Sequence, residues 1–112
     1  MKKIVMTHDL KNDTTKVLES PYGDAGAVYS GTLGMIEHFR LQLVSFRGQD
    51  KTAAEQEYLE RDIKGYERIL ASNNEANANA FLRRKSESRR SAVKYKDNID
   101  VIDSLIAEGV WL

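Results

Sequence analysis

The sequence contains no cysteine. Disulfide bonds, thiolate nucleophiles and thiolate metal ligands are therefore excluded together, and we expect a cytoplasmic protein. Long apolar runs are also missing. The first run, Ile4–Met6, is shorter than the apolar core of about seven or more residues in a signal peptide. No run approaches the roughly 18 apolar residues of a membrane span, so we expect a soluble chain without a membrane partner.

Net charge is absent as well, because 17 basic residues balance 17 acidic ones. No overall field draws the chain to nucleic acid or to a membrane, and any electrostatic function must come from local clusters. With 112 residues, 41% of them apolar and 30% charged, the composition is that of a globular protein. We expect a single domain over residues 1–112.

The predicted fold class is mainly α, with a short β or turn element in residues 1–20 and a helical region over 24–112. Residues 3–7 and 15–18 have strand character, and residues 11–14 are typical of a turn. This pattern favours a small β-hairpin. A strand followed by a short helix capped at Thr7 or Asp9 is the alternative.

A central helix is predicted over residues 25–47, with Asp24 as its N-cap and Gly48 at its end. At 100° per residue its apolar side chains fill about half the circumference, more than the stripe of an ordinary surface helix. Such a helix needs cover on more than one side. The arc contains Ala25, Val28, Tyr29, Thr32, Leu33, Met35, Ile36, Phe39, Leu43, Val44 and Phe46.

A second helix is predicted over residues 53–71, opened by a capping box from Thr52 to Glu55. A connection of about five residues predicts an antiparallel helical hairpin with the central helix. The apolar seam has coiled-coil spacing and consists of Leu59, Ile63, Tyr66 and Leu70. Acidic residues flank this seam, namely Glu55, Glu60, Asp62 and Glu67, and Arg61, Lys64 and Arg68 lie on the back.

The C-terminal part leaves two alternatives open. Residues 72–74 are a possible helix break, and residues 75–80 form either a loop or a thin helical continuation. From Phe81 to Ile106 the apolar spacing resumes, with Asp97 capping a separate last helix unless one helix runs through. The tail ends in Trp111 and Leu112, and we expect the Trp to dock on its own core or on a partner.

One dense basic cluster stands out between residues 83 and 96. Read as a helix, it places Arg84, Lys85, Arg89 and Lys96 beside the apolar seam, where they match the acidic flanks of the second helix. Arg83, Arg90 and Lys94 lie on the opposite face, with Glu87 between them. These three either contact phosphate groups or an acidic surface, or form an ordinary solvated face neutralised by Glu87.

The remaining candidate residues give no catalytic or metal motif. Arg40 falls inside the apolar arc, where it either pairs with a carboxylate of the second or last helix or binds an anion. His38 is predicted to be solvated, and His8 beside Asp9 resembles half of an acid–base pair without a nucleophile. Without an HExxH pattern we expect no metal, cofactor or catalytic residue. Gly31 and Gly34 indicate a close backbone approach and not a phosphate loop.

These observations predict a non-enzymatic helical interaction protein that docks on a protein partner and modulates or inhibits it. The alternative is a binder of nucleic acid, nucleotide or another phosphate ligand through the basic helix 83–96. The predicted binding residues are Arg83, Arg90, Lys94, Arg84, Arg89 and Arg40. The over-wide arc, the charged seam and the apolar tail together predict a homo-oligomer, most simply a dimer. An enzyme would need a site assembled between subunits from Arg40, His8 and Asp9.

Overall fold

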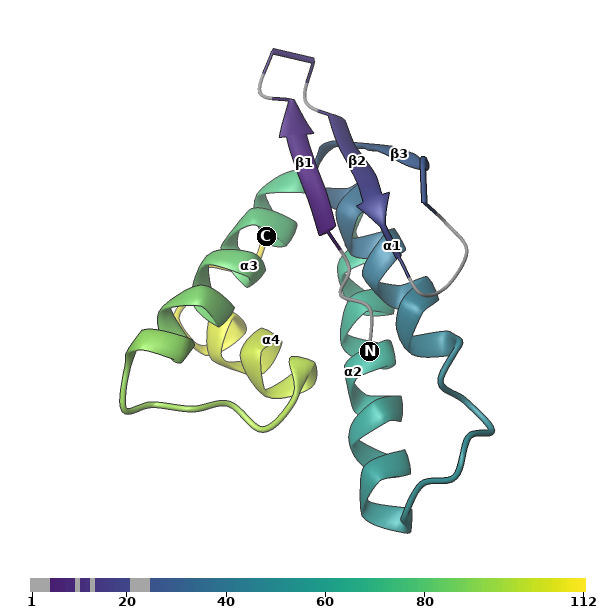
Figure 1. The fold of residues 1–112 in the computed structure, drawn as a ribbon. Coiled ribbons are helices and arrows are strands. Elements are labelled where there is room, and N and C mark those ends of the chain that lie inside the picture. The colour runs from purple at the N-terminus through teal and green to yellow at the C-terminus, as the bar shows by residue number, and fades with distance from the viewer. Residues whose placement is uncertain (1–4, 10, 13, 21–24) are drawn as a thin grey trace.

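The computed structural model describes residues 5–9, 11–12, 14–20 and 25–112, which form a small sheet and four helices (Figure 1). In chain order the elements are β1 (Val5–Asp9), β2 (Thr14–Glu19), β3 (Val28–Ser30), α1 (Gly31–Val44), α2 (Ala53–Ser72), α3 (Glu75–Arg90) and α4 (Asn98–Ala107). The prediction of a mainly helical chain with a short N-terminal β element is confirmed. None of the described helices is both long and apolar enough to cross a membrane.

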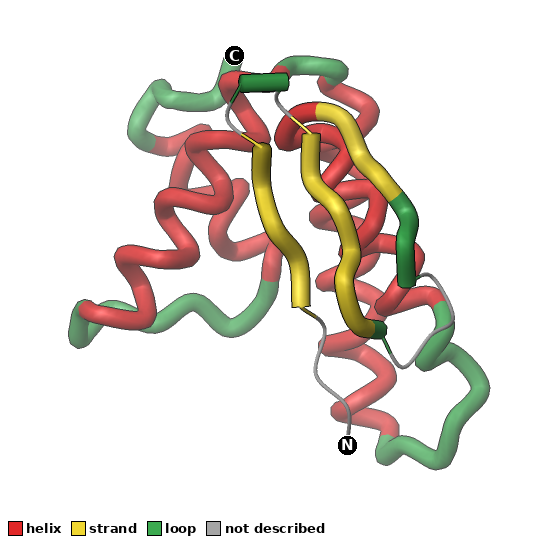
Figure 2. The backbone as a smooth tube through the Cα atoms, turned by 45° about the horizontal axis from the view of Figure 1, so that its top comes forward, coloured by secondary structure: helices red, strands yellow, loops and turns green. Residues whose placement is uncertain are grey.

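The strands form one antiparallel sheet in the order β1-β2-β3, which lies along one side of the helices (Figure 2). β1 and β2 are the predicted hairpin, with His8 opposite Thr15. Thr15 and Val17 are buried, whereas Lys16 and Leu18 are exposed, as expected for a sheet with one covered face. The third strand was not predicted, because Val28 and Tyr29 continue the apolar pattern of the helix that follows.

The central helix starts later than predicted. It begins at Gly31, and residues 28–30 belong to β3. Asp24, the predicted N-cap, lies outside the described residues, and Ser30 occupies the N-cap position. Gly31 has a φ of 65°, a left-handed conformation that favours glycine and allows the sharp turn from strand into helix. The prediction failed because an apolar strand and an apolar helix turn have overlapping sequence patterns.

The start of α1 is completed by groups from elsewhere in the chain. The Glu75 carboxylate of α3 accepts hydrogen bonds from the backbone N–H groups of Thr32 and Leu33, the second at 3.2 Å. This carboxylate does the work of an N-cap side chain. Gly34 faces Tyr29, and a Cβ on Gly34 would lie 3.1 Å from Tyr29 Cβ. The predicted close approach at this glycine is confirmed.

Both ends of α2 follow from the sequence. Thr52 Oγ1 accepts a hydrogen bond from the Glu55 N–H at 3.2 Å, and the Glu55 carboxylate accepts one from the Thr52 N–H at 3.1 Å. The predicted capping box is therefore present. The helix ends at Asn73, whose φ of 46° is left-handed. Three residues of the predicted seam are buried and the fourth is half-buried: Leu59, Ile63, Tyr66 and Leu70.

The two open alternatives are settled by caps. Asn74 caps α3, its side chain accepting from the Ala76 N–H at 2.8 Å, so the chain breaks at 73–74 and is helical again from Glu75. The Asp97 side chain accepts from the Asp100 N–H at 3.1 Å and opens α4 as a separate helix. The apolar spacing from 81 to 106 therefore crosses two helices and a loop, and no single seam runs through it.

One hydrophobic core draws on all four helices. Its buried members are Ile36, Tyr66, Ile69, Ala78, Phe81, Val101, Ile102 and Leu105. The Tyr66 ring lies between two other aromatic rings, with its centroid 5.9 Å from that of Phe39 and 5.7 Å from that of Phe81. Tyr66 thus joins α1, α2 and α3 around a single side chain.

The apolar tail docks on this core. Trp111 packs against the core, and the buried Asn77 side chain binds the backbone of Leu112, the residue after Trp111. Asn77 Oδ1 accepts from the Leu112 N–H at 2.8 Å, and Asn77 Nδ2 donates to the Leu112 carbonyl at 3.1 Å. Of the two docking places expected for Trp111, its own core or a partner, the structure shows the first. Homo-oligomerisation stays a prediction, and the tail that partly motivated it is accommodated within one chain.

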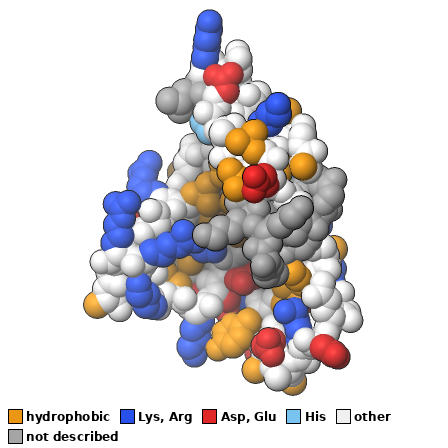
Figure 3. Space-filling model, in the orientation of Figure 1, with side chains coloured by type: hydrophobic (Ala, Val, Ile, Leu, Met, Phe, Trp, Pro, Cys, Tyr) orange, Lys and Arg blue, Asp and Glu red, His pale blue; other side chains and the backbone are white. Residues whose placement is uncertain are grey.

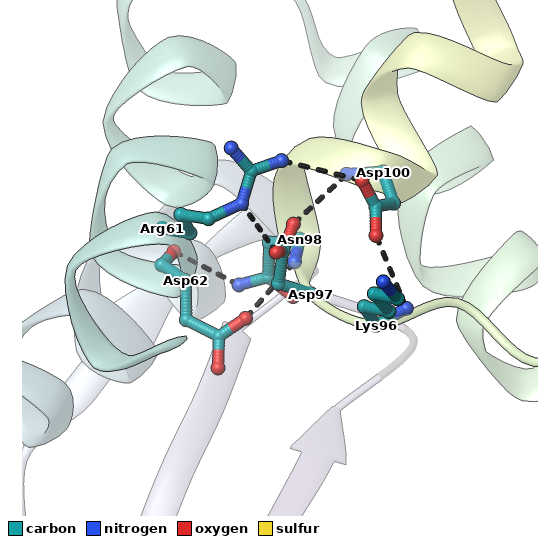
Figure 4. Close-up of polar contacts among 6 residues, drawn as sticks. All are labelled: Arg61, Asp62, Lys96, Asp97, Asn98 and Asp100. Carbon is teal, nitrogen blue, oxygen red and sulfur yellow. Dashed lines mark hydrogen bonds and ion pairs between the residues drawn. The ribbon is translucent and has the colours of Figure 1, made fainter. Parts of the chain in front are cut away.

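Among the described residues, the predicted charge matching forms no ion pair between α2 and α3, although Asp62 of α2 acts on Lys85 of α3 through its charge. The ion pairs of α2 with the C-terminal part instead join its arginines to aspartates at and near the start of α4. Arg61 pairs with Asp97 and Asp100 (Figure 4). Arg68 lies 3.6 Å from Asp103. The prediction failed because it treated residues 81–96 as one helix, whereas α3 ends at Arg90 and the loop turns α4 onto the back of α2.

Candidate anion-binding surface

Positive charge is concentrated in one short segment. Residues 83–96 contain seven Lys or Arg and a single Glu, in a chain whose total charge is zero. In the space-filling view, Lys and Arg side chains gather over the region of α3 (Figure 3). The segment comprises the last two turns of α3 and the loop that leads to α4. Cations in the last turn complement the helix dipole, but Arg83 lies too far from the helix end for this explanation.

Three arginines of this segment have no side-chain partner in the part of the chain that the structure describes. Arg83, Arg89 and Arg90 are exposed, and no side-chain hydrogen bond or ion pair joins them to another described residue. Glu87, predicted to neutralise this face, lies 3.9 Å from Arg84 instead. Arg83 and Arg90 are seven residues apart on one helix, two turns and about 10 Å along its axis. They form an open row of donors.

Lys94 is not on a helix face, contrary to the prediction, because α3 ends at Arg90. Its Nζ donates to the carbonyls of Ser88 and Arg89, at 2.7 and 3.1 Å. These carbonyls are among those that a helix C-terminus leaves without intrahelical partners. Lys94 therefore caps α3 and fixes the loop while remaining exposed at the surface.

Arg84 has a structural role. Its guanidinium donates to Ser104 Oγ at 2.8 Å and to a Glu108 oxygen at 3.0 Å, which ties α3 to α4. The Glu108 carboxylate raises the pKa of Arg84 above its usual value. Arg84 was predicted to bind a partner, but these bonds within the chain engage its guanidinium group, so it is not available as a binding residue.

Lys85 points inward. Its Nζ donates to Asn98 Oδ1 at 3.0 Å and lies 5.8 Å from the centre of the Tyr66 ring and 5.5 Å from that of Phe81. Burial lowers the pKa of this ammonium group, and the Asp62 charge opposes the shift in part.

Lys96 completes the surface. Its side chain is exposed and lines a cavity of about 280 Å³ between the end of α3, the loop and the start of α4. Its backbone N–H donates to the Asp100 carboxylate at 3.2 Å (Figure 4). The sequence placed Lys96 beside a helical seam, because nothing in it marked residues 91–97 as a loop except Asp97. We call the exposed cations Arg83, Arg89, Arg90, Lys94 and Lys96 the basic cap.

Arg40 does not belong to this surface. It pairs with Glu37 on its own helix, with Nη2 2.6 Å from Oε1, and Glu67 of α2 adds a weaker attraction. The predicted partner from the second or last helix was wrong, because Glu37 is one turn away on the same face. The half-buried Arg40 is therefore already neutralised.

His38 is fully buried, so the prediction of a solvated histidine was wrong. Its Nδ1 lies 3.0 Å from the Tyr29 hydroxyl, and β3 covers the face of α1 that the sequence pattern assigned to solvent. His8 Nδ1 bonds Thr15 Oγ1 at 3.0 Å, while the Asp9 carboxylate accepts the N–H groups of the following turn. Among the described residues no three His, Asp or Glu side chains come together as a metal site.

Comparisons with protein-family models, with curated proteins and with solved structures gave no match. The functional assignment therefore depends on the charge distribution and geometry described above.

Proposed function

We propose that the protein is a non-enzymatic binding protein whose basic cap docks on the phosphate backbone of a nucleic acid. One observation carries the proposal. The five arginines outside the cap each pair with a carboxylate, whereas Arg83, Arg89 and Arg90 pair with none in the described chain. The paired residues are Arg40, Arg47, Arg61, Arg68 and Arg84.

The arrangement favours phosphate groups over a protein surface. Protein interfaces have an apolar centre enriched in aromatic residues. On the loop of the cap the large exposed apolar side chain is Val93, and the Tyr95 hydroxyl bonds Ser104 of α4 at 3.1 Å. A surface with guanidinium groups and few apolar contacts gains its affinity from charge, as contacts to a nucleic-acid backbone do. We expect binding without base stacking and with little sequence preference.

The loop supports this role because it is held in place before any partner arrives. Ser88 Oγ donates to the Val93 carbonyl at 3.1 Å, and the Val93 N–H donates to Ser91 Oγ at 3.0 Å. Together with the Lys94 cap, these bonds fix the backbone between α3 and α4. Little loop entropy would then be lost on binding.

The test is binding to random-sequence duplex and single-stranded DNA and RNA at several salt concentrations. If Arg83, Arg89 and Arg90 each contact one phosphate, the logarithm of the affinity should fall with the logarithm of the salt concentration, with a slope of about −2.7 for duplex DNA and about −2 for single strands. The double substitution Arg83→Glu with Arg90→Glu should abolish binding and leave the circular dichroism spectrum unchanged.

A matched control is Lys16→Glu with Lys64→Glu. Both lysines are exposed and lie on β2 and α2, so this variant changes the net charge equally at a distance from the cap. It should bind almost as the parent does. Equal affinity of the cap variant and the parent would overturn the proposal.

An acidic protein surface is the second candidate, favoured by Val93, which is 60% exposed at the centre of the loop. The basic cap would then dock on this partner protein and modulate its activity. This candidate would be favoured if the parent captures one protein both before and after nuclease treatment and the variant Arg83→Glu with Arg90→Glu does not capture it.

A further inference from the structure

A cavity of about 280 Å³ opens beside the basic cap, at the corner where α3, the loop and α4 meet. This volume is just below the range of roughly 300–1,000 Å³ that is typical of small-molecule sites. The cations that line it come from different elements: Lys85 and Arg89 from α3, and Lys94 and Lys96 from the loop. Val101 and Asn98 of α4 supply a buried wall.

Lys85 at this cavity has unused donors. An ammonium group carries three N–H bonds. Asn98 Oδ1 accepts one of them, and no carboxylate of the described chain lies within ion-pair distance of Nζ. The two aromatic rings beside it attract the charge but accept no conventional hydrogen bond. A partly buried cation with free donors is a site where an anion gains more than at the surface.

The carboxylates of the cavity are already engaged. Asp62 Oδ1 accepts the Asn98 N–H at 2.9 Å, and Asp97 accepts from Arg61 and from the Asp100 N–H (Figure 4). These contacts also occupy the N-terminal amides of α4, so an anion here would be bound by side chains. Since Arg61 neutralises Asp97, the cations at the cavity exceed the remaining carboxylate.

We propose that this cavity binds a phosphomonoester dianion, with Lys85 Nζ at its inner end and Arg89 and Lys96 at its rim. A dianion matches the excess positive charge, and the volume leaves room for a sugar or base attached to the phosphate. The proposal rests on the proposed function in one respect: the phosphate would be the terminal group of a nucleic-acid strand whose backbone lies on the basic cap. A free phosphorylated metabolite is the other source of the same chemistry.

The lowered pKa of Lys85 supports this assignment. Its present neighbours do not fully offset the burial of its charge. A bound dianion would stabilise the charged ammonium and return the pKa towards its usual value. Phosphate binding should therefore raise the pKa of Lys85, which ¹H–¹⁵N NMR of the side chain can follow.

The experiment compares two forms of one single-stranded oligonucleotide, with a terminal phosphate and with a terminal hydroxyl, and includes inorganic phosphate alone. The parent should bind the phosphorylated strand about tenfold more tightly, roughly the free energy of one charged hydrogen bond. Lys85→Met should lose this preference and keep its affinity for the hydroxyl form. Because Lys85→Met leaves Asn98 Oδ1 unpaired, Arg89→Gln with Lys96→Gln is a second variant confined to exposed side chains.

The control Arg83→Gln removes a cation of the cap outside the cavity. It should weaken both oligonucleotides equally, which separates failure of backbone binding from failure of the phosphate site. Binding of inorganic phosphate that depends on Lys85, without preference for a phosphorylated end, would retain the site and identify a small ligand as its source. Equal affinities for both strands, with no phosphate binding that depends on Lys85, would overturn the proposal.

Discussion

Gly65 of α2 faces the side chain of Asn98 at the start of α4, and a Cβ on Gly65 would overlap Asn98 Cβ. The same Asn98 accepts from Lys85 and donates to the Asp62 carbonyl at 2.9 Å. The absence of a side chain at residue 65 therefore sets how closely the two helices approach. It also sets the position of the cavity wall.

We expect Gly65→Ala to destabilise the fold by about 1–3 kcal/mol, the usual cost of overpacking a core. Helix propensity alone would stabilise an α-helix by about 1 kcal/mol on the same change. Urea unfolding measures the change in the free energy of unfolding and shows whether the variant is destabilised or stabilised. Ala71→Gly, at an exposed position of the same helix, is the control and should cost about 1 kcal/mol. A stabilised Gly65→Ala variant would show that α2 and α4 are not in close contact.

The clamp between Asn77 and Leu112 gives a fluorescence prediction. Asn77→Ala removes two hydrogen bonds from a fully buried amide and should cost about 1–3 kcal/mol. Trp111, the single Trp of the chain, should become more exposed and its emission should shift to longer wavelength. Asn79→Ala on the exposed side of α3 should leave the emission unchanged. An unshifted spectrum in Asn77→Ala would mean that the tail docks without the clamp.

The Glu75 carboxylate should stabilise α1, although it belongs to α3. Glu75→Ala leaves the first amides of α1 without this acceptor, and we expect a loss of about 1–2 kcal/mol in the free energy of unfolding. Glu75→Gln keeps the oxygen and loses the charge, and should cost about 0.5–1 kcal/mol. Thermal denaturation measures both, with Glu87→Gln as a surface control on the same helix. Equal stability of the three variants would contradict the cap.

Tyr66 gives a pH prediction. Burial raises the pKa of its hydroxyl to about 12, against a partial opposing effect of the hydrogen bond with Asn98. The folded state therefore holds this proton more tightly than the unfolded chain, whose tyrosines ionise near pH 10. The corresponding stability is fully present below pH 10 and is lost as the pH rises towards 12.

Tyr66→Phe has no proton to lose and should show a smaller drop in stability between about pH 10 and 12 than the parent. Denaturant unfolding at several pH values in this window measures the difference. Absorbance at the tyrosinate band should also show that the variant lacks the tyrosine of the parent that ionises near pH 12. Parallel stability curves would contradict the shifted pKa.

Local signals predicted the parts of the fold that depend on neighbouring residues. The capping box at Thr52 and Glu55 was predicted outright, whereas the break at residues 72–74 and the cap at Asp97 were each one of two alternatives. All three signals satisfy backbone groups within one turn. The hairpin followed from alternation around a polar turn. Each of these features needs no knowledge of what packs against it.

Long-range features were not predictable in this way. The cap that Glu75 places on α1 joins residues more than forty positions apart. The burial of His38 depends on β3, and the inward position of Lys85 depends on the loop that folds α4 back. The candidate surface was predicted in part: Arg83, Arg89 and Arg90 are open, while Arg84 pairs with the distant Glu108, which periodicity could not identify. The partner of Arg40, Glu37, lies one turn away on the same helix and could have been identified from the sequence.

The segregation of charge described for residues 83–96 has a consequence for handling the protein. Those 14 residues carry a formal charge of +6, so the other 98 carry −6. A neutral molecule of this kind is a strong electric dipole, and charged surfaces will meet it in a preferred orientation. It should be retained on a cation-exchange resin at pH 7 through one end alone, and an immobilised polyanion would hold every molecule facing the same way.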